Sequence, residues 1–185
     1  MTDRTSNSLL SKALTAGALA LATTLGPGDG HAQPAAPSVA VQARNKEVVR
    51  RWSEELWGRG MGDVADQIVS PDYVRHDPGD PFPARGPADV KRIVRMLRGM
   101  LPDLSIEIDA MVAEGDVVVC RYTATATDTV GYMGMAPTGK KIRTAAMQMF
   151  RLVDGRIVES WAVRDDLGVL RQLGHYPPPS VAPRL

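Results

Sequence analysis

The apolar residues of this chain change their spacing once, at Leu104, and that change limits the possible folds more than any other feature. Between Asn45 and Pro102 they recur every three or four residues, which is the spacing of amphipathic helices. After Leu104 they alternate with polar residues, and Asp154-Gly155 joins the last two runs as a type I′ hairpin turn. Helices followed by antiparallel strands predict an α+β domain in which a curved antiparallel sheet wraps around about three N-terminal helices. The curvature is expected to enclose an apolar pocket.

The local signals also give the ends of these elements. One helix begins at Asn45 and stops at Gly58, a short one spans residues 63–69, and a third runs from Pro87 to Pro102. Strands are expected from Leu104 onward, over residues 117–127, 141–153 and 156–164. A last helix around residues 167–173 ends at Gly174.

The N-terminus has the pattern of a secretory signal peptide over residues 1–32. Arg4 and Lys12 precede an apolar run over residues 13–25, and cleavage is expected near Ala32. The mature protein is therefore expected to be exported to the periplasm or the medium. Residues 33–44, rich in Ala and Pro, predict a flexible linker, residues 45–174 the domain, and residues 175–185 a disordered tail.

Charge and cysteine content exclude several classes of partner. The formal net charge is +1 without a block of one sign, which argues against nucleic acid and anionic membranes. No later stretch approaches the ~20 apolar residues of a membrane-spanning helix. Cys120 is the only cysteine, so no internal disulfide is possible. His76, His175 and Cys120 lack the spacing of metal ligands, so no metal site is expected.

The end of the last strand is the best candidate for chemistry. Strict alternation puts Trp161 and Asp165 on one face, together with Ile157, Glu159 and Val163. In a pocket shared with Met133, Met147 and Met149, desolvation would raise the pKa of Asp165 toward that of a general base. The alternative is structural, because Asp165 or Asp166 could instead cap the last helix.

Three further kinds of residue have two interpretations each. His76 either points its ring into the same cavity or is a hydrogen-bonded structural residue. Arg121 is either a pocket cation or an ion-pair partner of Glu159 or Asp165. The methionines either fill the core or contact an apolar substrate.

In this arrangement the chain resembles the SnoaL-like polyketide cyclases, an ester cyclase family with the nuclear-transport-factor-2-like cone fold. The resemblance covers about residues 45–174. It rests on an ordered set of motifs: Tyr73-Val74-Arg75-His76, Leu101-Pro102-Asp103-Leu104, Ala113-Glu114-Gly115-Asp116, Gly134 through Pro137-Thr138-Gly139-Lys140, Arg151 through Asp154-Gly155-Arg156-Ile157-Val158-Glu159, Trp161, Asp165 and Gln172-Leu173-Gly174. The resemblance implies a cone-shaped α+β fold and a cofactor-free aldol ring closure on a small apolar carbonyl compound. In that reaction an aspartate, matched by Asp165, is the general acid and base.

Two departures from the family pattern affect the expected site. Family members often have Gly-Thr-His where this chain has Ala126-Thr127-Asp128, and Glu-His-Trp where it has Glu159-Ser160-Trp161. Asp128 is then either a substitute polar group or a turn residue.

Two alternative functions are also compatible with these residues. An epoxide hydrolase-like reaction could use Arg121, Asp165 and Asp128, and a non-catalytic exported binder of small apolar ligands could use the pocket alone. Apolar residues on the outer face of the sheet, together with the pairing habit of the fold, predict a homodimer.

Overall fold

A computed structural model describes residues 38–77 and 83–176. The predicted signal peptide, the start of the predicted linker and residues 177–185 of the predicted tail lie outside the described residues. The first helix, α1 (Val39–Arg50), continues into the π-helical segment η1 (Arg51–Gly58). It begins before the predicted Asn45, because the Ser38 hydroxyl accepts a hydrogen bond from the backbone N–H of Val41 at 3.4 Å and caps the helix.

The segment after η1 contains a strand that the sequence did not predict. α2 (Val64–Ile68) leads directly into β1 (Val69–Arg75), and α3 (Gly86–Met100) follows. β1 contains Pro71, which is compatible with its place at the edge of the sheet. In α3 a proline stands in the first turn, as the sequence predicted.

The sheet has the strand order β1-β5-β4-β3-β2. β2 (Ser105–Glu114), β3 (Val117–Thr127), β4 (Lys141–Val153) and β5 (Arg156–Arg164) pair antiparallel in sequence, as predicted. β1 pairs parallel with β5, so the sheet is mixed rather than wholly antiparallel. The β4–β5 turn has the predicted type I′ geometry, because Asp154 and Gly155 have positive φ angles of 50° and 76°.

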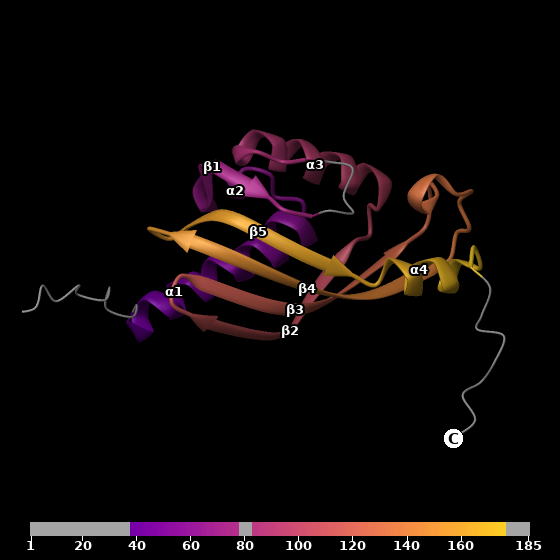
Figure 1. Ribbon diagram of the computed structural model, residues 1–185. Coiled ribbons are helices and arrows are strands. Elements are labelled where there is room, and N and C mark those ends of the chain that lie inside the picture. The colour runs from indigo at the N-terminus through magenta and orange to yellow at the C-terminus, as the bar shows by residue number, and fades with distance from the viewer. Residues whose placement is uncertain (1–37, 78–82, 177–185) are drawn as a thin grey trace, which may run out of the picture. The chain divides into compact units, whose positions relative to one another are not determined.

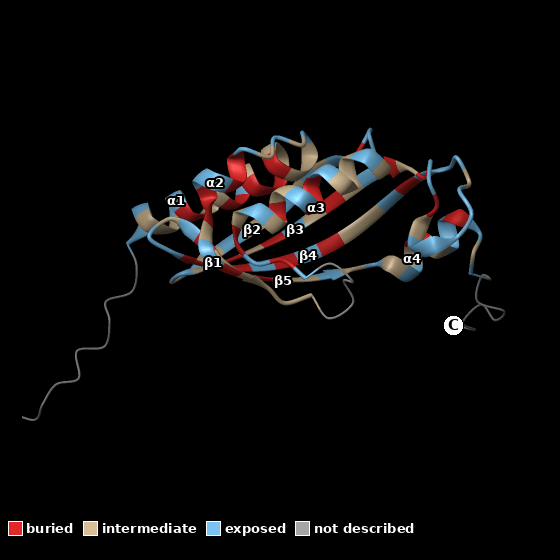
Figure 2. Cartoon of the chain, turned by 90° about the horizontal axis from the view of Figure 1, so that it is seen from above, coloured by how far each residue is buried: buried red, intermediate tan, exposed pale blue. Residues whose placement is uncertain are grey.

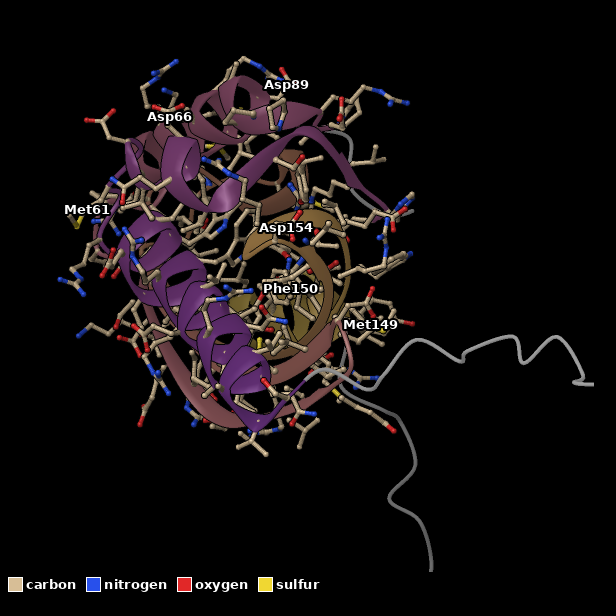
Figure 3. The ribbon with its side chains drawn as sticks, turned by 90° about the vertical axis from the view of Figure 1, so that its left-hand side faces the viewer. Met61, Asp66, Asp89, Met149, Phe150 and Asp154 are labelled. Carbon is tan, nitrogen blue, oxygen red and sulfur yellow. The ribbon has the colours of Figure 1, made fainter. Side chains whose placement is uncertain are left out.

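The helices cover one face of the curved sheet, which we call the inner face (Figure 1). Buried residues gather between the helices and this face (Figure 2). In the end-on view of Figure 3, Phe150 points inside the curve of the sheet, whereas its neighbour Met149 lies at the periphery. The alternation along β4 therefore separates a buried set of side chains from an exposed set.

Two apolar clusters occupy the inner face. The main core surrounds Trp52, whose ring lies 5.6 Å from that of Phe150 and 5.8 Å from that of Tyr73. A smaller cluster packs beneath α4 (Asp166–Leu173) and contains Ala126, Ile142 and Leu173. α4 stands at the end of the strands opposite to the β4–β5 hairpin (Figure 1). No helix among the described residues is long and apolar enough to cross a membrane.

Candidate active site

A β-bulge at Val158 decides which residues of β5 face inward. Arg151 of β4 pairs with Glu159, but the next residue, Leu152, pairs with Ile157, so Val158 is the extra residue on β5. A bulge of this kind shifts the alternation of side chains by one residue. Ile157 therefore faces inward before the bulge, and Ser160, Ala162 and Arg164 face inward after it. Ile157 and Ser160 are both fully buried. Glu159 and Trp161 consequently point outward.

Beyond the main core, the inward-facing residues become polar. Arg164 of β5 pairs across the sheet with the buried Ala146 of β4, which in turn pairs with Tyr122 of β3. This row lies between the two apolar clusters. Its charged and phenolic side chains belong to a set that we call the polar network: Arg75, Asp77, Tyr122, Tyr132, Arg164 and Asp166.

Asp77 anchors one end of the polar network. Its side chain is only 4% exposed, and its Oδ2 accepts a hydrogen bond from Arg75 Nε at 2.7 Å. Its Oδ1 accepts another from the backbone N–H of Ala162 at 2.7 Å, and Arg164 Nη1 lies 3.9 Å from Oδ2. The Arg75 guanidinium also stacks over the ring of Trp57, at 5.8 Å from its centroid. Both oxygens of Asp77 are thus engaged in holding the end of β1 against β5.

Asp166 stands at the other end of the polar network, in the first turn of α4. Its Oδ1 accepts a hydrogen bond from the Tyr132 hydroxyl at 2.5 Å and lies 3.5 Å from Arg164 Nε. Its Oδ2 receives no hydrogen bond from any described residue. The Asp166 side chain is 35% exposed. Asp166 therefore has one oxygen that accepts from Tyr132 and forms an ion pair with Arg164, and one oxygen without a hydrogen bond from a described residue.

The two tyrosines of the network remain protonated at ordinary pH. Burial raises the pKa of Tyr122 to about 12, against a smaller opposing effect of the Arg164 charge. Burial also raises the pKa of Tyr132, and the hydrogen bond to the Asp166 carboxylate raises it further. An open carboxylate, guanidinium groups and neutral phenols together can accept a proton and stabilise an oxyanion.

The predicted base, Asp165, occupies a different position from Asp166. It is exposed, and its Oδ1 accepts a hydrogen bond from the backbone N–H of Gly168 at 2.8 Å, which caps α4. A Cβ added to Gly168 would lie 2.1 Å from Asp165 Oδ2, so the cap depends on glycine there. The shared inward face predicted for Ile157, Trp161 and Asp165 was wrong, because the bulge separates Ile157 from the residues that follow it.

His76 and Trp161 do lie together, but on the outer face. Their rings stack at a centroid distance of 4.9 Å and an interplanar angle of 15°. His76 Nε2 lies 3.3 Å from Glu159 Oε1, and Arg151 Nε donates to Glu159 Oε2 at 2.5 Å. The hydrogen bonds from Arg151 and then His76 hold the pKa of Glu159 below its usual value. His76 is thus hydrogen-bonded, as its structural interpretation predicted.

The remaining predicted residues are spread over the outer face and one loop. Met147 and Met149 are exposed on β4, and Met133 is exposed in the short helix η2 (Tyr132–Gly134). Arg121 does form an ion pair, but its partner is Asp109 and not Glu159 or Asp165.

Asp128 is buried in the loop that joins β3 to β4. It accepts hydrogen bonds from the Thr138 backbone and hydroxyl, both at 2.8 Å, and from the Gly131 backbone at 3.1 Å. Burial by itself would raise the pKa of Asp128, but these hydrogen bonds and the nearby His175 hold it below the usual value. Asp128 therefore organises this loop, which agrees with its interpretation as a turn residue. Arg121, Asp165 and Asp128, the three residues of the epoxide hydrolase alternative, each have other partners.

Sequence reasoning missed most of the polar network. Asp166 and Arg164 flank the predicted Asp165, and Asp77 follows the predicted His76, so the motifs were found but their inward-facing members were not. The signal that could have corrected this is Ser160, a small polar residue between Glu159 and Trp161 that fits a buried position. Among the described residues, no group of three or more His, Cys, Asp or Glu side chains could hold a metal ion.

Comparison with known proteins gives a consistent picture. The family model for SnoaL-like polyketide cyclases matches residues 47–173. No curated protein matches the sequence.

Solved structures with the same fold are numerous, and three are similar in sequence as well. A candidate polyketide cyclase from Acidithiobacillus ferrooxidans is 31% identical, covers 76% of this chain and 100% of its own, and has a TM-score of 0.66. IdmH, a candidate polyketide cyclase from Streptomyces antibioticus, is 28% identical over 70% of this chain and 98% of its own, with a TM-score of 0.62. AclR, a candidate hydroxylase from Streptomyces galilaeus, is 29% identical over 74% and 89%, with a TM-score of 0.64.

Proposed function

Because the chain belongs to the SnoaL-like polyketide cyclase family, we propose that it is an enzyme that acts without a cofactor on a small apolar carbonyl compound. The reaction class is removal of a proton from the carbon next to a carbonyl, followed by aldol-type ring closure or isomerisation. The observation that carries the proposal is the open Oδ2 of Asp166, whose other oxygen is fixed by Tyr132 and Arg164. We assign the base to Asp166 rather than to the predicted Asp165, because the Asp165 side chain is engaged in capping α4.

The proposed steps use only groups of this chain. Asp166 Oδ2 takes the proton from the carbon, and the electron pair of the broken C–H bond moves to the carbonyl oxygen to form an enolate. The positive charge of Arg164 stabilises that negative charge. In a ring closure, the enolate carbon then bonds to a second carbonyl carbon of the same molecule. The new alkoxide takes the proton from Asp166, which restores the carboxylate.

The neighbours support the reaction class and not a particular substrate. Two are named as candidate polyketide cyclases, and polyketides carry the alternating carbonyl groups that make such carbon acids. A third is named as a candidate hydroxylase, so similar chains of this fold carry names for different reactions. The polar network lies between the two apolar clusters of the inner face.

Proton exchange tests the proposal without knowledge of the natural substrate. We expect the protein to accelerate the exchange of the benzylic α-protons of 2-tetralone for deuterium in D2O, followed by proton NMR. The variant Asp166→Asn should lose at least ~100-fold of this acceleration. Asp116→Asn is the matched control, because Asp116 is an exposed carboxylate in the β2–β3 turn, and it should keep full activity.

The same experiment separates the enzyme from a non-catalytic binder. Saturable binding of 2-tetralone without any acceleration of exchange would contradict the enzymatic proposal and favour the binder. Exchange that is equally fast with Asp166→Asn would contradict the assignment of the base.

A further inference from the structure

Gln148 is a buried glutamine on the inner face whose amide group has no partner. It lies on β4 between Phe150 of the main core and Ala146 of the row that carries the polar network. The residue is only 8% exposed, yet neither end of its amide makes a hydrogen bond with a described residue. Buried amides are normally paired, because leaving them unpaired away from water is unfavourable. Gln148 therefore has both a donor and an acceptor to offer to a ligand.

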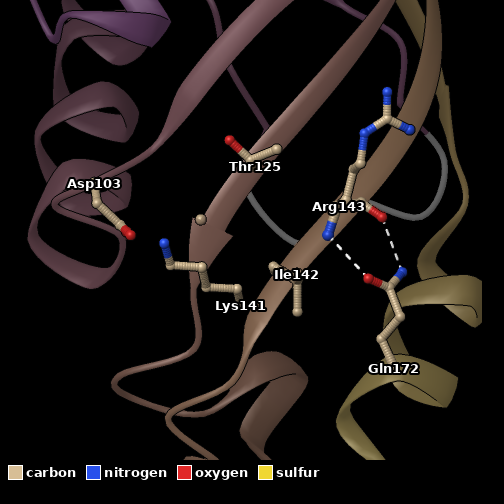
Figure 4. A pocket seen from close by; sticks show the side chains of 7 residues that line it. Asp103, Thr125, Lys141, Ile142, Arg143 and Gln172 are labelled. Atoms are coloured by element: carbon tan, nitrogen blue, oxygen red, sulfur yellow. Dashed lines mark hydrogen bonds between the residues drawn. The ribbon is translucent and has the colours of Figure 1, made fainter.

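Gln172 of α4 shows how this chain pairs a glutamine that has a structural role. Its Oε1 accepts a hydrogen bond from the backbone N–H of Arg143 at 2.9 Å, and its Nε2 donates to the Arg143 carbonyl at 2.8 Å (Figure 4). These two bonds tie α4 to β4. Gln172 is exposed and makes both bonds, whereas Gln148 is buried and makes neither. A structural role thus explains Gln172 but not Gln148.

Trp57 is a second unpaired group on the inner face. Its Nε1 is buried and has no hydrogen-bond partner among the described residues. In the π-helical segment η1, residues five apart are joined by the backbone hydrogen bonds and lie on the same side. In an α-helix they would be about 140° apart. The rings of Trp52 and Trp57 are accordingly only 5.6 Å apart, and both pack into the main core.

Asp77 connects these two unpaired groups. Its Oδ1 accepts from the backbone N–H of Ala162, which is the strand partner of Gln148. Its Oδ2 accepts from Arg75, whose guanidinium stacks over the Trp57 ring. Gln148 and Trp57 therefore both lie where the polar network meets the main core.

The strand geometry gives the spacing between Gln148 and the proposed reaction centre. Arg164, which stabilises the enolate in the proposed reaction, pairs with Ala146, two residues along β4 from Gln148. Two residues of a β-strand span about 6.5 Å. A ligand that reaches both groups therefore has two oxygens separated by a distance of this order, as at opposite ends of two fused six-membered rings.

We propose that Gln148 and Trp57 bind a second oxygen of the substrate, a hydroxyl or carbonyl oxygen on the ring remote from the carbon that loses its proton. Trp57 can only donate, so this oxygen accepts, and Gln148 donates to it or accepts from its hydroxyl hydrogen. The inference rests on the proposed function, because the ketone of the substrate is placed at Arg164. It adds a specificity for rings that carry oxygens at both ends.

Binding of two related ketones tests the inference without turnover. 2-Tetralone has one oxygen, and 6-hydroxy-2-tetralone carries a second one at the opposite end of the fused rings. In isothermal titration calorimetry, we expect the wild type to bind the hydroxy compound about tenfold more tightly. Gln148→Met should reduce this preference to less than about twofold. Trp57→Phe, which keeps an aromatic ring without the N–H, should reduce it to about threefold.

Gln42→Met is the matched control, because it removes the same amide from α1, and it should keep the tenfold preference. Thermal melts verify that the variants are folded, and the ratio of the two Kd values cancels any general loss of binding. If Gln148→Met does not fold, Trp57→Phe decides the matter. The inference is overturned if the wild type does not bind the hydroxy compound or binds both ketones equally. It is also overturned if the folded variants keep the tenfold preference.

The calorimetric result is separate from the exchange assay. A preference that is lost in Gln148→Met, in a wild type that catalyses no proton exchange, would support the binding role and contradict the proposed function. Exchange that depends on Asp166, with a preference that Gln148→Met leaves unchanged, would overturn this inference alone.

Discussion

The main core and the polar network lie next to each other on the inner face, yet they are built from opposite kinds of residue. In the main core, Phe150 and Trp52 are buried against aliphatic neighbours, and their packing does not depend on a charged group. Further along the inner face, Arg164 of β5 lies 3.9 Å from Asp77 and 3.5 Å from Asp166. Apolar burial stabilises a fold, whereas buried charges cost desolvation energy and rarely stabilise it. We therefore expect the core to carry stability and the network to carry chemistry.

The largest expected effect is at the centre of the main core. Phe150→Ala removes a fully buried ring that contacts Trp52, and it should lower the free energy of unfolding by about 3 to 5 kcal/mol. Urea unfolding followed by tryptophan fluorescence measures this loss. Asp166→Asn, measured in the same way, should cost less than about 1 kcal/mol. If Asp166→Asn lowers the free energy of unfolding more than Phe150→Ala does, the assignment of stability to the main core and of chemistry to the polar network is contradicted.

The polar network should make the free energy of unfolding depend on pH in the alkaline range, through Tyr122. Because the pKa of Tyr122 is raised to about 12, the unfolded chain ionises this phenol at lower pH than the folded chain does. The contribution of the neutral Tyr122 phenol to the free energy of unfolding is therefore fully present below pH ~10. As the pH rises toward ~12, this contribution of about 2 to 3 kcal/mol is lost. Tyr122→Phe should remove this part of the alkaline loss, and urea unfolding at several pH values checks it. An identical alkaline loss in wild type and variant would contradict the burial of this phenol.

A smaller effect is expected at the cap of α4. Asp165→Ala should cost about 1 kcal/mol and Asp165→Asn only a few tenths, because an amide can still accept the capping hydrogen bond. Gly168→Ala should also destabilise the wild type, since the new methyl group would meet the Asp165 carboxylate. In an Asp165→Ala background the same change should stabilise the helix by up to about 1 kcal/mol. Thermal melts of the three variants and the double variant test this coupling, and strict additivity would argue against the cap.

The outer face should contribute least to the stability of one chain, and we propose that it pairs two copies. Met147 and Val163, a cross-strand pair of β4 and β5, are exposed there, Val163 at 76%, and Val112 of β2 is exposed as well. Light scattering at micromolar concentration should give the mass of a dimer. Val163→Lys should shift the protein to monomers and change monomer stability by less than about 0.5 kcal/mol. A wild type that remains monomeric at all concentrations would contradict the pairing.

The sequence predicted the fold well wherever the decisive signals were local. The Asp154-Gly155 turn, the alternation along β3 and β4, and Gly174 at the end of α4 each depend on a few neighbouring residues, and the structure confirms them. β1 was missed because its strand partner, β5, lies far along the sequence and because Pro71 is typical of a strand end. The early start of α1 at Val39 was missed because its cap, Ser38, follows a stretch rich in Ala and Pro.

The site was harder to predict, because one backbone irregularity reverses the assignment of faces. Alternation of side chains predicts the faces of β5 correctly as far as the bulge at Val158. No residue type at that position is typical of a bulge, so the sequence does not indicate it. Trp161 and Glu159 consequently lie on the outer face, whereas Arg164 faces inward. Long-range contacts such as Tyr132 with Asp166 join a loop to a helix and cannot be derived from spacing.

The most direct test of the central claim compares the two adjacent aspartates in the 2-tetralone exchange assay. Both substitutions to asparagine keep the size of the side chain, and thermal melts verify that both variants are folded. We predict that Asp166→Asn loses at least ~100-fold of the catalysed exchange, whereas Asp165→Asn stays within about threefold of the wild type. The reverse result, with Asp165→Asn inactive and Asp166→Asn active, would contradict the polar network as the reaction centre.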